Sequence, residues 1–307
     1  MPSHLAVRIS ASTSNLGPGF DFLGLCLGLH LEAEAHAVDG GLAHRVEYES
    51  APATWSEGDD LVLRTLAAYE KCVSVKLRPL CVRVRSEIPI GRGFGSSGAA
   101  VAATLLLASA HHSRADGAHP GEPDRDLLVD IALSIEGHPD NGTASLLGGC
   151  TLSVPHGGAV TVVRQPVHPS LGFALAWPAT PLFTDEARAV LPSSIPFADA
   201  VENPRRLALL LEGLRSGAPR LLALGIEDRL HERHRRSLIP GSNEACQAAR
   251  DAGAFAACLS GAGSGLVAIG PPEAMEGVAA ALASPLEDGV GRAVQFEPDA
   301  PRVREIE

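Results

Sequence analysis

The 307-residue sequence predicts an α+β fold in two domains. Segments with helical patterns are mixed with strand patterns joined by tight turns, which favours partly antiparallel sheets over a doubly wound parallel sheet. A chain of this length commonly forms about two domains. The turn-rich segment from Pro166 to Gly172 predicts a boundary between residues 1–165 and residues 166–307.

In the first half, segments 5–9, 27–38 and 80–85 predict strands; "LCVRVR" at 80–85 alternates apolar and charged residues most cleanly. Segment 97–110 is rich in strong helix formers, and a second helix is expected at 126–136, ending at "GHPDNG". The intervening residues 111–125 contain Gly and Pro and predict a loop. A strand pattern then runs from about residue 148 to 163.

The second half predicts a strand at 172–177 and a helical region at 197–236, interrupted at Gly217–Pro219. A short helix is expected after Ser242, strands on both sides of "SGAGSG" (260–265), a helix at 272–283 and a last strand at 292–297. We expect the tail "DAPRVREIE" to be loose.

Composition excludes several classes of protein. The formal net charge of −11 disfavours nonspecific binding to nucleic acid, which needs a basic surface. The first residues show no apolar signal core, and the longest apolar segment, Ala99 to Ala110, is too short to span a bilayer. Six dispersed cysteines without a C-x-x-C pair indicate reduced, buried thiols. We therefore expect a cytoplasmic protein that binds neither nucleic acid nor membranes.

A glycine-rich loop connects the predicted strand at 80–85 to the predicted helix. It reads "PIGRGFGSSG", with glycines at positions 91, 93, 95 and 98. Glycine lets a ligand approach the main chain, and a helix N-terminus offers unpaired N–H groups, so the loop predicts a phosphate site. A Walker loop is excluded because no lysine follows, and Ser96 stands where the dinucleotide fingerprint needs glycine.

Four motifs together resemble the GHMP kinases, a superfamily that phosphorylates small alcohols with ATP. "PIGRGFGSSGAA" is similar to the central motif P-x-x-G-L-G-S-S-A-A. "SASTSNLGPGFDFLGLCLGL" at 10–29 and "EGHPDN" at 136–141 resemble signatures of the homoserine kinase branch, and "CLSGAGSGLVAI" at 258–269 resembles the third motif of the superfamily. The resemblance implies an N-terminal, ribosomal-protein-S5-like domain that binds ATP and a C-terminal, ferredoxin-like domain, with the active site between them.

The sequence departs from the family pattern at a few positions. Phe94 stands where Leu is usual, Gly98 where Ala is usual, and Asp60 where an Asn contacts the nucleotide. Gly142-Thr143-Ala144 replaces Val-Ala-Pro after the "DN" pair. These differences leave two alternatives open: a GHMP kinase with another hydroxylated substrate, and a non-catalytic ligand sensor on the same fold.

The resemblance implies transfer of the γ-phosphoryl group of ATP to the side-chain hydroxyl of L-homoserine, a step of threonine biosynthesis, with Mg²⁺ as cofactor. The expected metal ligands are Glu136 with Ser97 or Ser96, because Mg²⁺ prefers oxygen donors, and Asp130 is the alternative carboxylate. The residues assigned to ATP binding are Pro89, Gly91, Arg92, Gly93, Phe94, Gly95, Ser96, Ser97, Gly98 and Asp60.

A zwitterionic substrate requires groups of both charges. By resemblance, Asn15 and Asp21 contact the hydroxyl and ammonium ends. Arg188 and Arg235 hold the carboxylate, since a guanidinium binds it through two hydrogen bonds; Arg233 and Arg236 are neighbouring alternatives to Arg235. His138, Thr184 and Gly261 complete the expected substrate site.

The catalytic residues implied are His138, Asp140 and Asn141. Asparagine cannot accept a proton at neutral pH, so we expect direct attack by the substrate hydroxyl, with Asp140 as the alternative base. The family also implies a homodimer.

Overall fold

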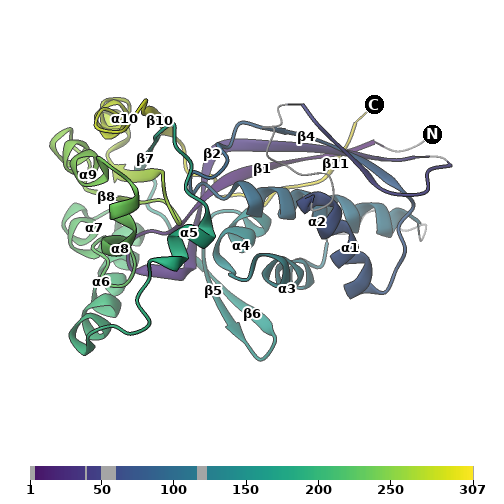
Figure 1. Ribbon diagram of the computed structural model, residues 1–307, viewed down its shortest axis with the longest axis horizontal. Helices are drawn as coiled ribbons and strands as arrows, with labels where there is room; N and C mark the ends of the chain where they lie inside the picture. Colours follow the sequence, from purple (N-terminus) through teal and green to yellow (C-terminus); the bar gives the residue numbers. More distant parts are fainter. Residues whose placement is uncertain (1–3, 39, 50–59, 116–122, 307) are drawn as a thin grey trace.

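The computed structural model describes residues 4–38, 40–49, 60–115 and 123–306 and shows two lobes, each built on one sheet (Figure 1). Strand β6 of the first sheet ends at Gln165, and the next strand along the chain, β7 at Gly172, begins the second sheet. The chain therefore passes from one sheet to the other inside the segment where the sequence places a boundary. The division into two domains remains a prediction.

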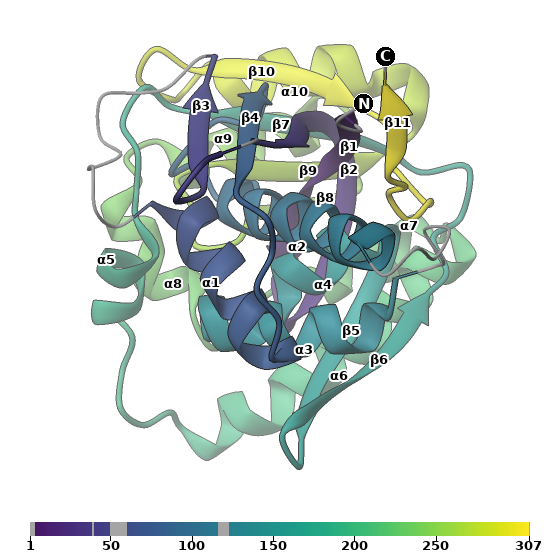
Figure 2. The same ribbon diagram turned by 90° about the vertical axis from the view of Figure 1, so that its right-hand side faces the viewer.

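The first lobe contains a sheet in the order β11-β1-β2-β4-β3, and β5 and β6 extend it from β2. Figure 2 shows β11 and β3 at opposite edges. All pairs are antiparallel except β3 with β4. The strands are β1 (His4–Asn15), β2 (Gly19–Ala37), β3 (Arg45–Tyr48), β4 (Leu80–Ser86), β5 (Cys150–His156), β6 (Ala159–Gln165) and β11 (Arg304–Ile306).

Strands β1 and β2 are longer than the sequence predicts. The expected end of β1 at Ile9 is wrong because the polar run that follows stays in the sheet. Ser12, Thr13 and Ser14 are buried there, and their hydroxyls find hydrogen-bond partners in other segments. A search for apolar alternation cannot detect such a strand.

Helix α2 is the centre of the first lobe. It packs against β1, β2 and the other three helices, and its apolar residues are buried around most of its circumference. The expected loop at 111–125 is wrong for residues 111–115, which extend α2, and His111 is buried with its Nε2 3.3 Å from the Ala35 carbonyl. The helices are α1 (Leu61–Val73), α2 (Ser96–Ala115), α3 (Arg125–Glu136) and α4 (Asp140–Leu147).

The second lobe has an antiparallel four-stranded sheet in the order β10-β7-β9-β8. With helices between β7 and β8 and between β9 and β10, this is the ferredoxin-like arrangement. Its strands are β7 (Gly172–Trp177), β8 (Ala256–Leu259), β9 (Leu266–Gly270) and β10 (Val290–Val294). Its helices are α5 (Thr184–Ala189), α6 (Phe197–Ser216), α7 (Pro219–Gly225), α8 (Glu232–Arg235), α9 (Ser242–Asp251) and α10 (Met275–Ala283), with 3₁₀ turns η1 (Arg236–Leu238) and η2 (Pro272–Ala274).

The expectation of a loose tail is wrong. After β10 the chain returns to the first lobe, where β11 pairs antiparallel with residues 4–6 of β1. Arg114 forms an ion pair with Glu305, and Arg125 donates to the Pro301 carbonyl at 2.7 Å. These partners lie more than a hundred residues away in the chain, so the tail sequence alone does not reveal them.

Among the described residues, no helix is long and apolar enough to cross a membrane. Five cysteines are buried, whereas Cys72 is exposed, so the expectation of buried thiols is wrong for that residue.

Removal of residues 302–307 is expected to lower Tm by about 3–6 °C, because β1 loses one of its two partner strands and its outer edge becomes unpaired. Calorimetry would measure the change. A full-length Arg304→Ser/Glu305→Ser variant keeps the backbone pairing and controls for the lost side chains. An unchanged Tm in the truncated chain would contradict a stabilising role for β11.

Candidate active site

A cavity of about 430 Å³ lies where the first lobe meets α5 and the loop between β8 and β9. The loop between β4 and α2 forms most of its wall. The lining residues that the sequence assigns to a site are Asp60, Pro89, Gly91, Arg92, Gly93, Phe94, Gly95, Ser96, Ser97, His138, Asn141, Thr184 and Gly261.

The glycine loop touches other main-chain segments where side chains would not fit. Gly91, Gly93 and Gly95 all have positive φ, between 66° and 72°. A Cβ atom at Gly93 would lie 2.0 Å from the Ser260 carbonyl oxygen, and one at Gly95 would lie 2.1 Å from Ser12 Oγ. The loop therefore brings bare backbone to the start of α2, where the N–H groups of a helix N-terminus favour an anion.

Four residues of the expected ATP site also make contacts with other parts of the chain. Arg92 donates to the carbonyl groups of Pro178, Ala179 and Ile90. The buried Phe94 ring packs edge-on against Trp177, and Gly98 leaves room for Asn141. The Asp60 carboxylate caps α1 and accepts a hydrogen bond of 2.6 Å from Tyr48.

Asn141 is held rigidly beside the cavity. Its Oδ1 accepts from Ser12 Oγ at 2.9 Å, and its Nδ2 donates to Ser14 Oγ at 3.0 Å. The Asn141 N–H donates to the buried Asp140 carboxylate at 2.7 Å, and His138 Nδ1 lies 2.8 Å from the same oxygen. Burial opposes a charge on His138, but the hydrogen bond and charge of Asp140, with the charge of Glu136, raise its pKa overall.

Glu136 lies at the end of α3, next to the start of α2. Ser97 Oγ donates to its Oε1 at 2.9 Å. Its Oε2 is buried and finds no hydrogen-bond partner within the described part of the chain. Burial raises the pKa of Glu136 to about 7. The alternative carboxylate, Asp130, instead accepts from the Val160 N–H of β6 at 2.9 Å.

Asp21 and Arg188 form a two-point ion pair, although 167 residues separate them. Their N–O distances are 2.6 and 3.0 Å, and about a third of each side chain is exposed. The Asp21 N–H donates to Asn15 Oδ1, and Asn15 Nδ2 donates to the Gly261 carbonyl. Asn15, Leu16 and Asp21 all have positive φ, a strained conformation that is typical of binding sites.

Arg235 lies next to this pair and is 1% exposed. It donates to the carbonyls of Ala187 at 3.1 Å and Gly261 at 3.3 Å. The alternatives in the sequence lie elsewhere: Arg233 pairs with Asp199, and Arg236 pairs with Glu232.

Several residues outside the predicted set support the site. Ser12 and Ser14 hold Asn141; Phe20 and His231 contact Arg235; Phe183 lines the cavity. Alternate serines in "SASTSN" are the one available signal, since they share a face of a strand. The other contacts join segments far apart in the chain.

Comparison with known proteins defines the class. The family "GHMP kinases N terminal domain" matches residues 60–149, and "GHMP kinases C terminal" matches residues 210–288. The chain belongs to the GHMP kinase family, and the expected fold class is confirmed.

Within that family its relatives include proteins named homoserine kinase. One from Synechococcus sp. (strain RCC307) is 39% identical over 91% of this chain and 88% of its own. Another, from Caldanaerobacter subterraneus subsp. tengcongensis, is 36% identical over 89% and 85% of the two chains.

Solved structures of GHMP kinases share the fold. A homoserine kinase from Cytophaga hutchinsonii has a TM-score of 0.83 at 23% identity, covering 98% of this chain and 97% of its own. A mevalonate kinase from L. major, in complex with R-mevalonate, has a TM-score of 0.71 at 14% identity, with the same coverage.

The substitution Gly93→Ala is expected to weaken ATP binding by about tenfold or more, because its Cβ would push the glycine loop away from Ser260. Calorimetric titration with ATP would measure the change in Kd. Gly277→Ala, in α10 with open space around the new methyl group, is the matched control. Unchanged ATP affinity in Gly93→Ala would contradict the proposed tight loop contact.

Proposed function

We propose that this protein transfers the γ-phosphoryl group of ATP to the side-chain hydroxyl of L-homoserine, producing O-phospho-L-homoserine for threonine biosynthesis. The relatives named homoserine kinase support this substrate. The observation that carries the proposal is the Asp21–Arg188 pair with Arg235 beside it, next to the glycine loop.

The charges of this cluster suit an amino acid. Asp21 can bind an ammonium group, and Arg188 with Arg235 can bind a carboxylate. When a zwitterion binds, Asp21 can pair with its ammonium group and Arg188 with its carboxylate. The ion pair between Asp21 and Arg188 is then replaced, and neither side chain is left without an opposite charge. Asn15 and Gly261 connect this cluster to the cavity. An uncharged isoprenoid or sugar would not need both charges.

The proposed phosphate site is the glycine loop with Ser96 and the start of α2. Its N–H groups favour the phosphates, and phosphoryl transfer depends mainly on positioning and charge neutralisation. Asn141, held by two serines, orients the substrate hydroxyl, which attacks the phosphorus directly. The raised pKa of His138 favours its charged form beside the phosphates, and Asp140 is engaged in orienting both neighbours.

Glu136 and Ser97 fit a magnesium site. A buried carboxylate oxygen without a partner, next to a hydroxyl, offers the hard oxygen donors that Mg²⁺ prefers. When bound, Mg²⁺ would neutralise phosphate charge. We further propose, from the resemblance, that the enzyme works in the cytoplasm and forms a homodimer. Light scattering would test whether it is a homodimer.

In a coupled ADP-release assay with Mg-ATP, we expect turnover on L-homoserine to exceed that on L-threonine, L-serine and mevalonate. Arg235→Leu should lower kcat/KM for homoserine by about 100-fold or more, because a charged hydrogen-bond donor is lost. Arg233→Leu is the matched control, since that guanidinium pairs with Asp199 on the surface.

Each other result identifies an alternative. Turnover on a different alcohol would identify that alcohol as the substrate in place of homoserine, and the protein would still be a kinase. ATP binding without turnover on any of the four would indicate a ligand sensor.

Glu136→Gln is expected to increase the free energy of unfolding by about 1–3 kcal/mol at pH 8 and by less toward pH 5. The pKa of Glu136 is raised to about 7 in the folded chain from 4.5, so its contribution to stability is lost as pH rises through 7. Urea denaturation at several pH values would measure this difference. Glu136→Gln should also need more Mg²⁺ for activity, whereas the control Asp130→Asn should not. A stability difference that does not vary with pH would contradict the raised pKa.

A further inference from the structure

We propose that His231 and Phe20 are positioning residues, which orient the Arg235 guanidinium toward the substrate carboxylate. This inference rests on the proposed function, in which Arg235 binds the carboxylate of an amino acid. Both residues contact Arg235, and both lie outside the set of site residues that the motifs assign.

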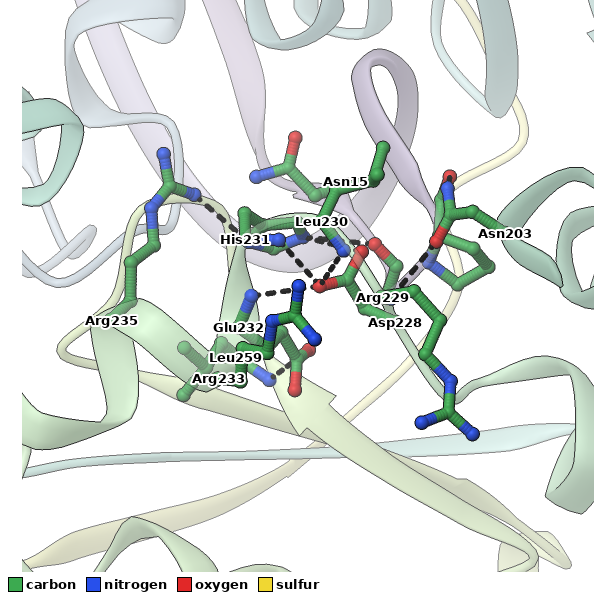
Figure 3. A network of polar contacts seen from close by, with 12 residues as sticks. Asn15, Asn203, Asp228, Arg229, Leu230, His231, Glu232, Arg233, Arg235 and Leu259 are labelled. Atoms are coloured by element: carbon green, nitrogen blue, oxygen red, sulfur yellow. Dashed lines mark hydrogen bonds and ion pairs between the residues drawn. The ribbon is translucent and has the colours of Figure 1, made fainter. Parts of the chain in front are cut away.

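His231 connects Arg235 to the N-terminal motif. Its side chain is completely buried. Its Nδ1 lies 3.1 Å from Arg235 Nη1, and its Nε2 lies 2.9 Å from the Gly17 carbonyl oxygen (Figure 3). A guanidinium only donates, so Nδ1 must accept; a carbonyl only accepts, so Nε2 must carry the hydrogen. The two contacts together select the neutral Nε2–H tautomer.

Asp228 holds the turn that carries His231. Its Oδ2 accepts from the N–H groups of Leu230, His231 and Glu232 at 3.0, 2.7 and 2.8 Å, which caps the start of α8. Its Oδ1 is buried, has no hydrogen-bond partner in the described segments, and lies 3.8 Å from His231 Nε2. The negative charge is thus on the side of the ring that carries the hydrogen, which further favours this tautomer.

Phe20 supports Arg235 from a second side. Its ring stacks on His231 with centroids 4.9 Å apart, and the Arg235 Cζ atom lies 5.1 Å from the Phe20 centroid. Arg188 Cζ lies 5.6 Å from the same ring. One aromatic ring therefore contacts both guanidinium groups that the proposed function assigns to the carboxylate, and each contact is favourable as a cation–π interaction.

The partners of Arg235 are all neutral. They are two carbonyl groups, an imidazole and an aromatic ring. Arg188 has a carboxylate partner in Asp21, but no carboxylate of the described residues forms an ion pair with Arg235. Burial and the charge of Arg188 lower the pKa of Arg235, and they outweigh the charges of Asp21, Asp228 and Glu232, which raise it. The arrangement fixes the direction of Arg235 and leaves its charge available to an anion.

Three substitutions of His231 test the effects of its two hydrogen bonds one at a time. His231→Asn places an acceptor oxygen near the Nδ1 position, His231→Gln places a donor near Nε2, and His231→Leu removes both. We expect KM for homoserine to rise about tenfold or more in the Gln and Leu variants and to stay within about threefold in the Asn variant. The kcat value and KM for ATP should change by less than about threefold in all of them.

Phe20 and a control histidine complete the series. Phe20→Leu should raise KM for homoserine about fivefold or more, and Phe20→Tyr, which keeps the ring, should restore it. His234→Asn is the matched control, because His234 lies in α8, three residues after His231, and contacts Arg233 instead. If His231→Leu folds and keeps the wild-type KM for homoserine, or if kcat, both KM values and Tm all change together, the positioning role is wrong.

A measurement on the protein without substrate tests the positioning role of His231 independently of the proposed function. Nitrogen-15 NMR of the wild-type imidazoles, assigned by comparison with His231→Asn, should show His231 as the neutral Nε2–H tautomer. Another tautomer, or a charged ring at neutral pH, would overturn the inference and leave the proposed function standing. Conversely, wild-type protein that does not phosphorylate homoserine would overturn the proposed function, whatever the tautomer.

Discussion

The candidate active site depends on close main-chain contact between the two lobes. The Ser260 carbonyl reaches Gly93 so closely that no Cβ atom would fit, and Gly265 donates to the Arg92 carbonyl at 3.1 Å. Gly261 donates to the Ser14 carbonyl at 3.0 Å. Three segments from different parts of the chain thus meet at one place, and any side chain larger than hydrogen at Gly93 would separate them.

This contact brings the phosphate loop and the charged cluster together. Asn15 and Arg235 both donate hydrogen bonds to the Gly261 carbonyl. Asn141 is held by Ser12 and Ser14, which lie directly before and after Thr13, the residue that contacts Ser260. These hydrogen bonds therefore set the positions of the binding groups relative to the glycine loop.

Sequence motifs predict many residues of the candidate site, because a motif reflects the backbone conformation and the side chains that one short segment needs. The glycines at 91, 93 and 95 need positive φ, and "GHPDN" places three polar groups within four residues. Motifs could not reveal that Asp21 pairs with Arg188 or that Phe20 lies under two arginines, since these contacts join distant segments. The buried hydroxyls of β1 could not be predicted for another reason. Their hydrogen bonds make burial possible, so polar residues occupy strand positions at which the alternating pattern predicts apolar residues.

The path of the chain after β10 affects how the protein can be made. Strand β11, which covers the edge of β1, follows the whole second lobe in the sequence. On the ribosome the first lobe emerges early, but its outer edge stays open until residues 304–306 leave the exit tunnel. Folding of the first lobe is therefore completed only after the second lobe has been synthesised, and during that interval the exposed edge is the surface that a chaperone would need to protect.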